Sequence, residues 1–351
     1  MAGLSGKKRS PFLFLAGAFV AIAALTFVAN RRSGLAYEVS FPLNDGVAYL
    51  YTRGDYLAAV CHDDKVYVWD WNNLSAKPRI VEVQSDQTVL LESGYVASVR
   101  RSGAYAMVVA DLDGGREDKR IPIPAGDRRV YLGANRSGCA AAAVLAEAGR
   151  EAKRGGQEVM LVDCNAGLVR PVVALREAAG DRVTSMAVSD DGYLVALTGE
   201  RAGQGWVALV NVEQTHLVWD KQLPDLQKIH NAVFSTDGRV IYIRGTDSTV
   251  QILDSNTGNV LKRLLPFREN RSTARSQDVQ VLATSNDGRF MAANVSNTVC
   301  IWDCATDKVI FSKWPGHKLV SGLAFSPDSK FLATSDSRQG GTIKIWRVPK
   351  R

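Results

Sequence analysis

Two short groups of residues have types and spacings that could do chemistry. The stretch His62–Asp64 joins an imidazole to two carboxylates, the groups that a metal site or a general acid–base pair uses. Gly203–Gly205 has two glycines at the spacing that opens a phosphate-binding loop. The first group falls between two apolar runs, where a turn is expected, and the second lacks a third glycine and a following helix. Both are therefore interpreted as turns.

The cysteines would support zinc or disulfide chemistry only if they converged with other ligands. Their number is odd, none forms a CxxC pair, and the four histidines are scattered. We interpret the cysteines as small buried hydrophobic residues. No metal-ligand, nucleophile or calcium-loop motif occurs elsewhere, so no catalytic residue, cofactor or metal is expected. The five cysteines are Cys61, Cys139, Cys164, Cys300 and Cys304.

The charge is concentrated at the N-terminus. The whole chain of 351 residues has a formal net charge of +7. Residues 1–37 contain five basic residues and no acid, which leaves +2 for the rest. A nearly neutral body argues against a broad phosphate-binding surface, and no nucleic-acid partner is expected.

Those basic residues flank an uncharged apolar segment, Pro11–Asn30. Twenty helical residues span about 30 Å, which matches the hydrocarbon core of a bilayer. The segment is longer than the apolar region of a cleaved signal peptide, so an uncleaved transmembrane helix is favoured, with a signal peptide as the alternative. The expected organisation is a basic tail over residues 1–10, the anchor over 11–30, a linker over 31–35 and the folded body over 36–351.

The flanking charges also bear on orientation. Three basic residues precede the segment and two follow it. This bias predicts a single-pass membrane protein with a cytoplasmic N-terminus. The body would then lie on the opposite side, in a periplasmic or lumenal compartment.

The body consists of seven copies of one pattern, in which three apolar strands are separated by tight turns. Asp and Gly at the turns and alternation in the strands indicate antiparallel sheets. The third strands are expected to end at residues 70, 111, 163, 211, 254, 303 and 347, at intervals of 41 to 52 residues. This is the period of a four-stranded propeller blade.

The copies resemble the WD-repeat family. The resemblance is carried by the stretches Gly316-His317, Phe325–Asp328, Ile301–Asp303 and Val68–Asp70, together with Trp346, and it covers residues 37–351. It implies an all-β fold, a seven-bladed β-propeller, here preceded by one N-terminal transmembrane helix. It also implies a hydrogen-bonded set of His317, Thr334 or Ser335, Asp336 and Trp346. The other copies lack most of this set.

The last copy stops after its third strand, although a blade needs four. Residues Ala36–Leu43 precede the first copy and have no other assigned role. A strand there that joined the last blade would close the ring and remove its exposed edges.

In WD-repeat proteins, partners often bind the face formed by the loops between second and third strands and between blades. Arginine suits carboxylate recognition and interface hot spots. We therefore expect partner contacts in these loops, first in the atypical insert Ala146–Gly156, with a merely solvated rim as the alternative. The candidate residues are Arg100, Arg101, Arg150, Lys153, Arg154, Arg201, Arg244 and Arg338.

Two functions follow from these features. The first is a membrane-tethered, non-catalytic protein-interaction scaffold, an accessory subunit of a membrane protein complex. The second is a quinoprotein-like propeller that acts as an envelope assembly factor or as a small-molecule-binding or enzymatic domain. The closing segments of the fourth and fifth copies resemble quinoprotein repeats, but calcium ligands and a larger ring are missing.

Overall fold

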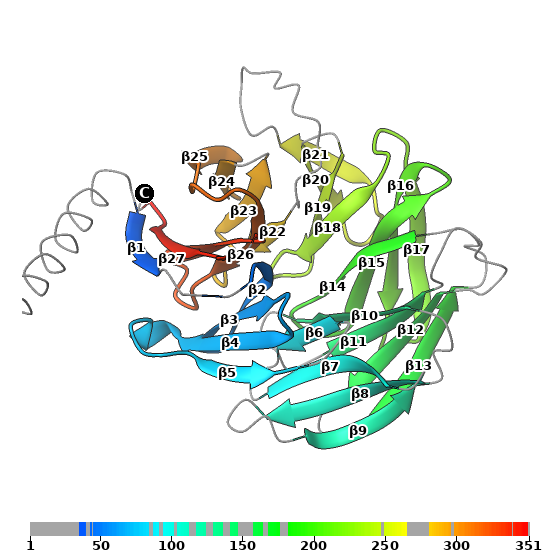
Figure 1. Ribbon diagram of the computed structural model, residues 1–351. Coiled ribbons are helices and arrows are strands. Elements are labelled where there is room, and N and C mark those ends of the chain that lie inside the picture. Colours follow the sequence, from blue (N-terminus) through cyan, green and yellow to red (C-terminus); the bar gives the residue numbers. More distant parts are fainter. Residues whose placement is uncertain are drawn as a thin grey trace, which may run out of the picture.

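The described residues form seven antiparallel sheets of four strands each, which follow one another around a common axis (Figure 1). The computed structural model describes residues 35–39, 43, 45–83, 87–90, 94–101, 104–111, 117–123, 129–135, 141–146, 157–163, 168–175, 182–246, 249–264, 281–295, 298–338 and 340–349.

Blades 1 to 3 are each built from four consecutive strands. A short 3-10 helix, η1 (Trp71–Asn73), follows the third strand of blade 1. The strands are β2 (Val47–Arg53), β3 (Tyr56–Cys61), β4 (Lys65–Asp70) and β5 (Arg79–Glu82) in blade 1, β6 (Gln87–Leu90), β7 (Gly94–Arg101), β8 (Ala104–Asp111) and β9 (Glu117–Ile123) in blade 2, and β10 (Arg129–Ala134), β11 (Ala141–Ala146), β12 (Gln157–Asp163) and β13 (Leu168–Leu175) in blade 3.

Blades 4 to 6 repeat this arrangement, and blade 7 combines three C-terminal strands with the first strand of the chain. The strands are β14 (Arg182–Val188), β15 (Leu194–Arg201), β16 (Gln204–Asn211) and β17 (His216–Leu223) in blade 4, β18 (Ile229–Phe234), β19 (Val240–Gly245), β20 (Val250–Asp254) and β21 (Val260–Leu264) in blade 5, β22 (Leu282–Thr284), β23 (Phe290–Val295), β24 (Thr298–Asp303) and β25 (Lys308–Lys313) in blade 6, and β26 (Val320–Phe325), β27 (Phe331–Asp336), β28 (Ile343–Arg347) and β1 (Leu35–Val39) in blade 7.

The repeats predicted from the sequence are confirmed at the third strand of every blade. These strands end at the predicted residues, so the period of the sequence is the period of the sheets. The seven ends are Asp70, Asp111, Asp163, Asn211, Asp254, Asp303 and Arg347.

A Ser-x-Asp turn between the first and second strands recurs in blades 4 to 7. In blade 7 the Ser326 hydroxyl donates to Asp328 Oδ1 at 2.7 Å and accepts from Phe331 N at 2.9 Å. The same carboxylate oxygen accepts from Lys330 N at 3.1 Å. Equivalent bonds in the other three blades confirm that these aspartates shape turns.

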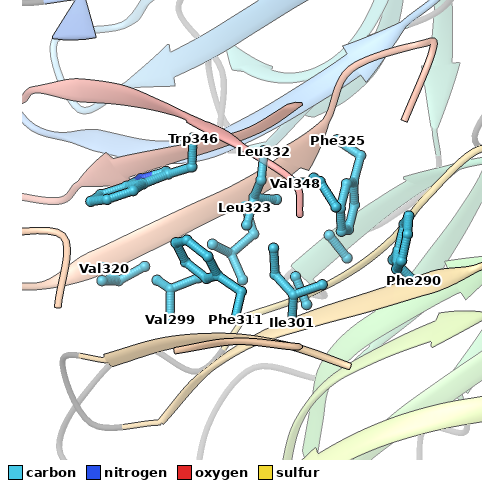
Figure 2. Packing of buried hydrophobic residues seen from close by; sticks show 12 residues of the cluster. Phe290, Val299, Ile301, Phe311, Val320, Leu323, Phe325, Leu332, Trp346 and Val348 are labelled. Carbon is cyan, nitrogen blue, oxygen red and sulfur yellow. The ribbon is translucent and has the colours of Figure 1, made fainter. Parts of the chain in front are cut away.

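The core lies between blades, where each sheet packs its apolar face on the next one. Figure 2 shows the contact of blades 6 and 7, in which Phe311 meets Trp346 edge to face with ring centroids 5.7 Å apart. Trp69 and Trp302, at matching places on their third strands, are 2% and 1% exposed. These two tryptophans therefore pack in the core between neighbouring blades.

The first strand of the chain completes the last blade. β1 pairs antiparallel with β28, so that Leu35 lies opposite Trp346 and Val39 lies opposite Ile343. The ring is joined on the inside as well, because β2 contacts β26. We call the side that carries the loops between second and third strands the loop face, and the side that carries the Ser-x-Asp turns the turn face. β1 begins toward the turn face and ends toward the loop face.

The expected anchor, Pro11–Asn30, lies outside the described residues, as do the basic tail and residues 31–34. Within the described ranges, no helix is both long and apolar enough to span a bilayer.

Candidate interaction face

The loop face places the candidate residues in different settings. Arg201 is the last residue of β15, and its guanidinium donates to both carboxylate oxygens of Asp220 on β17, at 2.6 and 2.8 Å. It also stacks on the ring of Trp206, 4.8 Å from the ring centroid. Arg201 therefore binds its own blade, and only 23% of its side chain is exposed.

Arg244 corrects the sequence analysis. The sequence predicts an exposed loop at this position, but Arg244 lies in β19 and is only 1% exposed. Its guanidinium donates to the carbonyl oxygen of Thr249 at 3.1 Å. Since a partner could not reach this side chain without opening blade 5, Arg244 serves the interior of the ring.

Arg338 agrees with its expected place. It is exposed in the connection between β27 and β28, and its backbone N–H donates to Asp336 Oδ1 at 3.1 Å. Arg100 and Arg101 form the end of β7 and not a loop, and they belong to the loop-face end of blade 2. The remaining candidates, Arg150, Lys153 and Arg154, lie outside the described residues together with most of the insert Ala146–Gly156.

The hydrogen-bonded set implied by the family resemblance is present in blade 7. The Thr334 hydroxyl lies 2.8 Å from His317 Nε2 and accepts from Trp346 Nε1 at 3.1 Å. Asp336 approaches the other ring nitrogen of His317 at 4.0 Å. Burial outweighs the nearby Asp336 carboxylate and lowers the pKa of His317 to about 4. The imidazole is therefore neutral at pH 7 and ties the connection between blades 6 and 7 to β27.

The two groups whose residue types suggested chemistry are turns. Residues His62–Asp64 join β3 to β4, with Asp64 in the left-handed region at φ 60°, and His62 Nε2 lies 3.2 Å from Ser337 Oγ of blade 7. Ala202 and Gly203 form the two-residue hairpin between β15 and β16. Across the described ranges, no cluster of three or more histidine, cysteine, aspartate or glutamate side chains is placed to hold a metal ion.

The described cysteines agree with their interpretation as hydrophobic residues. Cys61 and Cys300 are buried, and burial raises the pKa of their thiols to about 12 and about 11. Cys304 is partly buried, and Cys139 and Cys164 lie outside the described residues.

A channel of about 590 Å³ runs along the axis and is lined by the innermost strand of every blade. His230 and Asn231 of β18 line it, and His230 Nε2 and Asn231 Oδ1 are buried without a hydrogen-bond partner. Burial lowers the pKa of His230 to about 4, and Lys228 and Arg244 lower it further. Tyr49 and Tyr51 of β2 also line the channel, and they stack with ring centroids 6.2 Å apart.

Sequence reasoning missed one conspicuous surface residue. Trp314 follows β25 in the connection between blades 6 and 7, and it is 67% exposed. Lys318, four residues later, is also exposed. No sequence signal distinguished Trp314 from the packed tryptophans, although it lies two positions before the Gly316-His317 element.

The fold and the blade 7 hydrogen bonds define a β-propeller with a WD-type repeat. The family described as "WD domain, G-beta repeat" matches residues 308–347, which cover β25 to β28. The β-propeller domain of Cps50 (Swd1) from Myceliophteria thermophila is similar in structure, with a TM-score of 0.64 and 13% identity over 90% of this chain and 99% of that one. These findings support a WD-repeat β-propeller.

Among curated proteins, the chain is similar to WD repeat domain-containing protein 83. The rat protein is 26% identical over 188 residues, which are 52% of this chain and 53% of that protein. The human protein is 26% identical over 118 residues, or 32% of this chain and 34% of that one. The Arabidopsis thaliana protein ROOT INITIATION DEFECTIVE 3 is 32% identical over 74 residues, or 20% and 16%. The chain thus spans about half, or less, of the length of these relatives.

Proposed function

We propose that this chain is a non-catalytic protein-interaction scaffold, tethered to a membrane by residues 11–30, that serves as an accessory subunit of a membrane protein complex. The observation that carries the scaffold role is the closed ring, in which β1 pairs with β28 and apolar packing joins the blades. A closed ring offers partners a rigid surface, so that little conformational entropy is lost on binding.

The use of the polar residues supports a binding role. The aspartates of the Ser-x-Asp turns, the His62–Asp64 turn and the buried His317 each have a structural partner or position. The loop face, in contrast, keeps the side chains of Lys318 and Arg338 exposed to solvent. Exposed arginine and aromatic side chains are enriched at surfaces that recognise proteins.

The direction of β1 supports an orientation for the tethered protein. Leu35 lies toward the turn face, so the preceding chain enters blade 7 from that side. If residues 11–30 span the bilayer, the loop face points away from it. We propose a cytoplasmic N-terminus and a ring on the periplasmic or lumenal side, as the flanking charges predict.

Crosslinking mass spectrometry on native membranes tests the scaffold role. We expect loop-face lysines such as Lys318 to crosslink to one recurrent protein, and turn-face lysines such as Lys330 to serve as the internal comparison. Crosslinks confined to this chain would contradict the scaffold role. The tether is tested separately by alkaline carbonate extraction. The full chain should stay with the membranes, and a chain that starts at Leu35 should be released.

One observation favours a small-molecule role as the second candidate. The channel of about 590 Å³ falls within the usual size range of ligand pockets, and it holds the unpartnered polar atoms of His230 and Asn231. Native mass spectrometry of the protein purified from its own membranes should then show a bound compound that is lost in H230F. A mass equal to that of the bare chain would eliminate this role.

A further inference from the structure

Trp314 differs from every other tryptophan of the chain. Of the seven tryptophans, it alone is exposed, at 67%, whereas the others are buried or partly buried. Trp346 and Trp206 also donate hydrogen bonds from their indole nitrogens, to Thr334 and Asp220. A large aromatic side chain left in water on a folded protein marks an interaction site when its surroundings are also suited to binding.

The connection that carries Trp314 is held along its length. Gly316 has a φ of 77°, a conformation that favours glycine, and a Cβ there would lie 3.1 Å from Lys344 Nζ. His317 is buried and bonded to Thr334. Lys318 N then donates to Asp336 Oδ2 at 2.8 Å. Because the residues after Trp314 are fixed, a partner that covers the indole orders little additional chain.

The surface around Trp314 is basic. Lys313, Lys318 and Arg338 are exposed, and the ammonium group of Lys344 reaches the same connection. The carboxylate in their midst, Asp336, is occupied by backbone N–H donors from Lys318, Leu319 and Arg338. Since Asp336 binds both Lys318 N and Arg338 N, it brings these two cationic residues together.

We propose that this surface docks an acidic segment of a partner protein that carries an apolar side chain. We call the surface the Trp314 platform, and it consists of Trp314, Lys313, Lys318 and Arg338. The apolar side chain of the partner covers the indole, and its carboxylates pair with the flanking cations. The inference rests on the proposed scaffold function and adds to it the chemistry of the partner. The positive charge of the platform selects an acidic occupant over a basic or neutral one.

A displayed library of random peptides tests which chemistry the platform selects. The full chain in detergent is the target. Enriched peptides should combine Glu or Asp with a central leucine, phenylalanine or tryptophan. Synthetic copies should bind W314S about tenfold more weakly or worse, because Trp314 is the apolar anchor. The matched control is L261S, since Leu261 is 58% exposed on β21, away from the platform. L261S should bind as the unaltered chain does.

The charges are tested by the double variant K318E/R338E, which should abolish binding of the same peptides. Both side chains are exposed, and thermal melting should show that the double variant and W314S remain folded. Enriched peptides without acidic residues, peptides that bind W314S fully, or no enrichment at all would overturn the proposal. If K318E/R338E lost more binding to anionic phospholipid vesicles than to the peptides, the platform would be a lipid contact. This result would also overturn the proposal.

Zero-length carbodiimide crosslinking on native membranes separates this inference from the scaffold function. The reagent joins a lysine to a carboxylate that touches it, so Lys318 or Lys313 should be joined to Glu or Asp of a partner. K318R keeps the charge and removes the Lys318 product. A recurrent partner that crosslinks elsewhere on the ring, unaffected by W314S, would leave the scaffold standing and refute the platform. If acidic peptides required Trp314 for binding but no partner were crosslinked in the membranes, the platform would stand and the scaffold function would be refuted.

Discussion

Arg201 and Asp220 are joined by two parallel hydrogen bonds, and the same carboxylate accepts a third from Trp206 Nε1 at 2.9 Å. Trp206 is fully buried. The arginine that sequence reasoning assigned to partner binding thus pairs with the carboxylate that accepts the N–H of a buried tryptophan.

The first prediction concerns this pair. Asp220→Ala leaves the buried Trp206 N–H without its partner and should cost about 1–3 kcal/mol of unfolding free energy. Arg201→Ala should cost less, because Asp220 keeps its bond to Trp206. Urea unfolding of the chain from Leu35 onward measures both. Equal losses would mean that the bond to Trp206 contributes nothing of its own.

A second prediction concerns the hairpin between β15 and β16. Ala202 and Gly203 both have positive φ, at 49° and 78°, and a two-residue hairpin of this kind favours Asn-Gly. Left-handed backbone costs a non-glycine residue about 1–2 kcal/mol, least for Asn. Ala202→Asn should therefore raise the melting temperature. Gly203→Ala is the matched control and should lower it. A lower melting temperature for Ala202→Asn would contradict the assigned turn.

The third prediction concerns Thr334. Its hydroxyl contacts His317 Nε2 and accepts from Trp346 Nε1, and all three residues are buried. Thr334→Val keeps the shape and removes the hydroxyl, which should cost about 1–3 kcal/mol because buried polar atoms lose their partner. Thr334→Ser keeps the hydroxyl and should retain more stability in urea unfolding. The reverse order would show that the methyl group, not the hydroxyl, is what matters.

The fourth prediction is a pH dependence. Burial holds the pKa of His317 and His230 at about 4, below the ordinary value of 6.5. Between these values the unfolded chain binds protons that the folded chain does not bind, so stability falls as the pH falls from about 6.5 toward 4. The urea midpoint should be lower at pH 5 than at pH 7. His317→Gln should reduce this difference, and the exposed His216→Gln should leave it intact. A midpoint that rises at pH 5 would show that the two histidines do not remain neutral.

Much of the ring was readable from the sequence. The third strands end at the residues that the repeats predicted, because an apolar strand followed by turn chemistry fixes a strand end locally. The missing fourth strand of the last copy pointed to Ala36–Leu43, and the strand that pairs with β28 runs from Leu35 to Val39. That reasoning needs only the rule that strand edges are covered.

The loop face was less readable, because the exposure of a side chain depends on how neighbouring blades meet. Arg244 comes after a run of apolar residues and has the appearance of a loop residue, yet it lies within β19 and is buried. Trp314 and Trp302 are the same residue type only twelve positions apart, and one is exposed while the other is buried. Residue type alone therefore misplaced Arg244 and could not distinguish Trp314 from the buried tryptophans. The exposure of both residues is decided by how the blades pack in the ring.

The pairing of β1 with β28 also sets an order in time. β1 is the first strand of the ring to leave the ribosome and β28 is the last, with roughly 300 residues between them. Contacts this distant in sequence form late, because a long segment of chain must be brought together first. Blades 1 to 6 can therefore assemble during synthesis. β1 has no strand to pair with until β28, the last strand of the ring, has emerged. The emergence of β28 is the event that completes the ring.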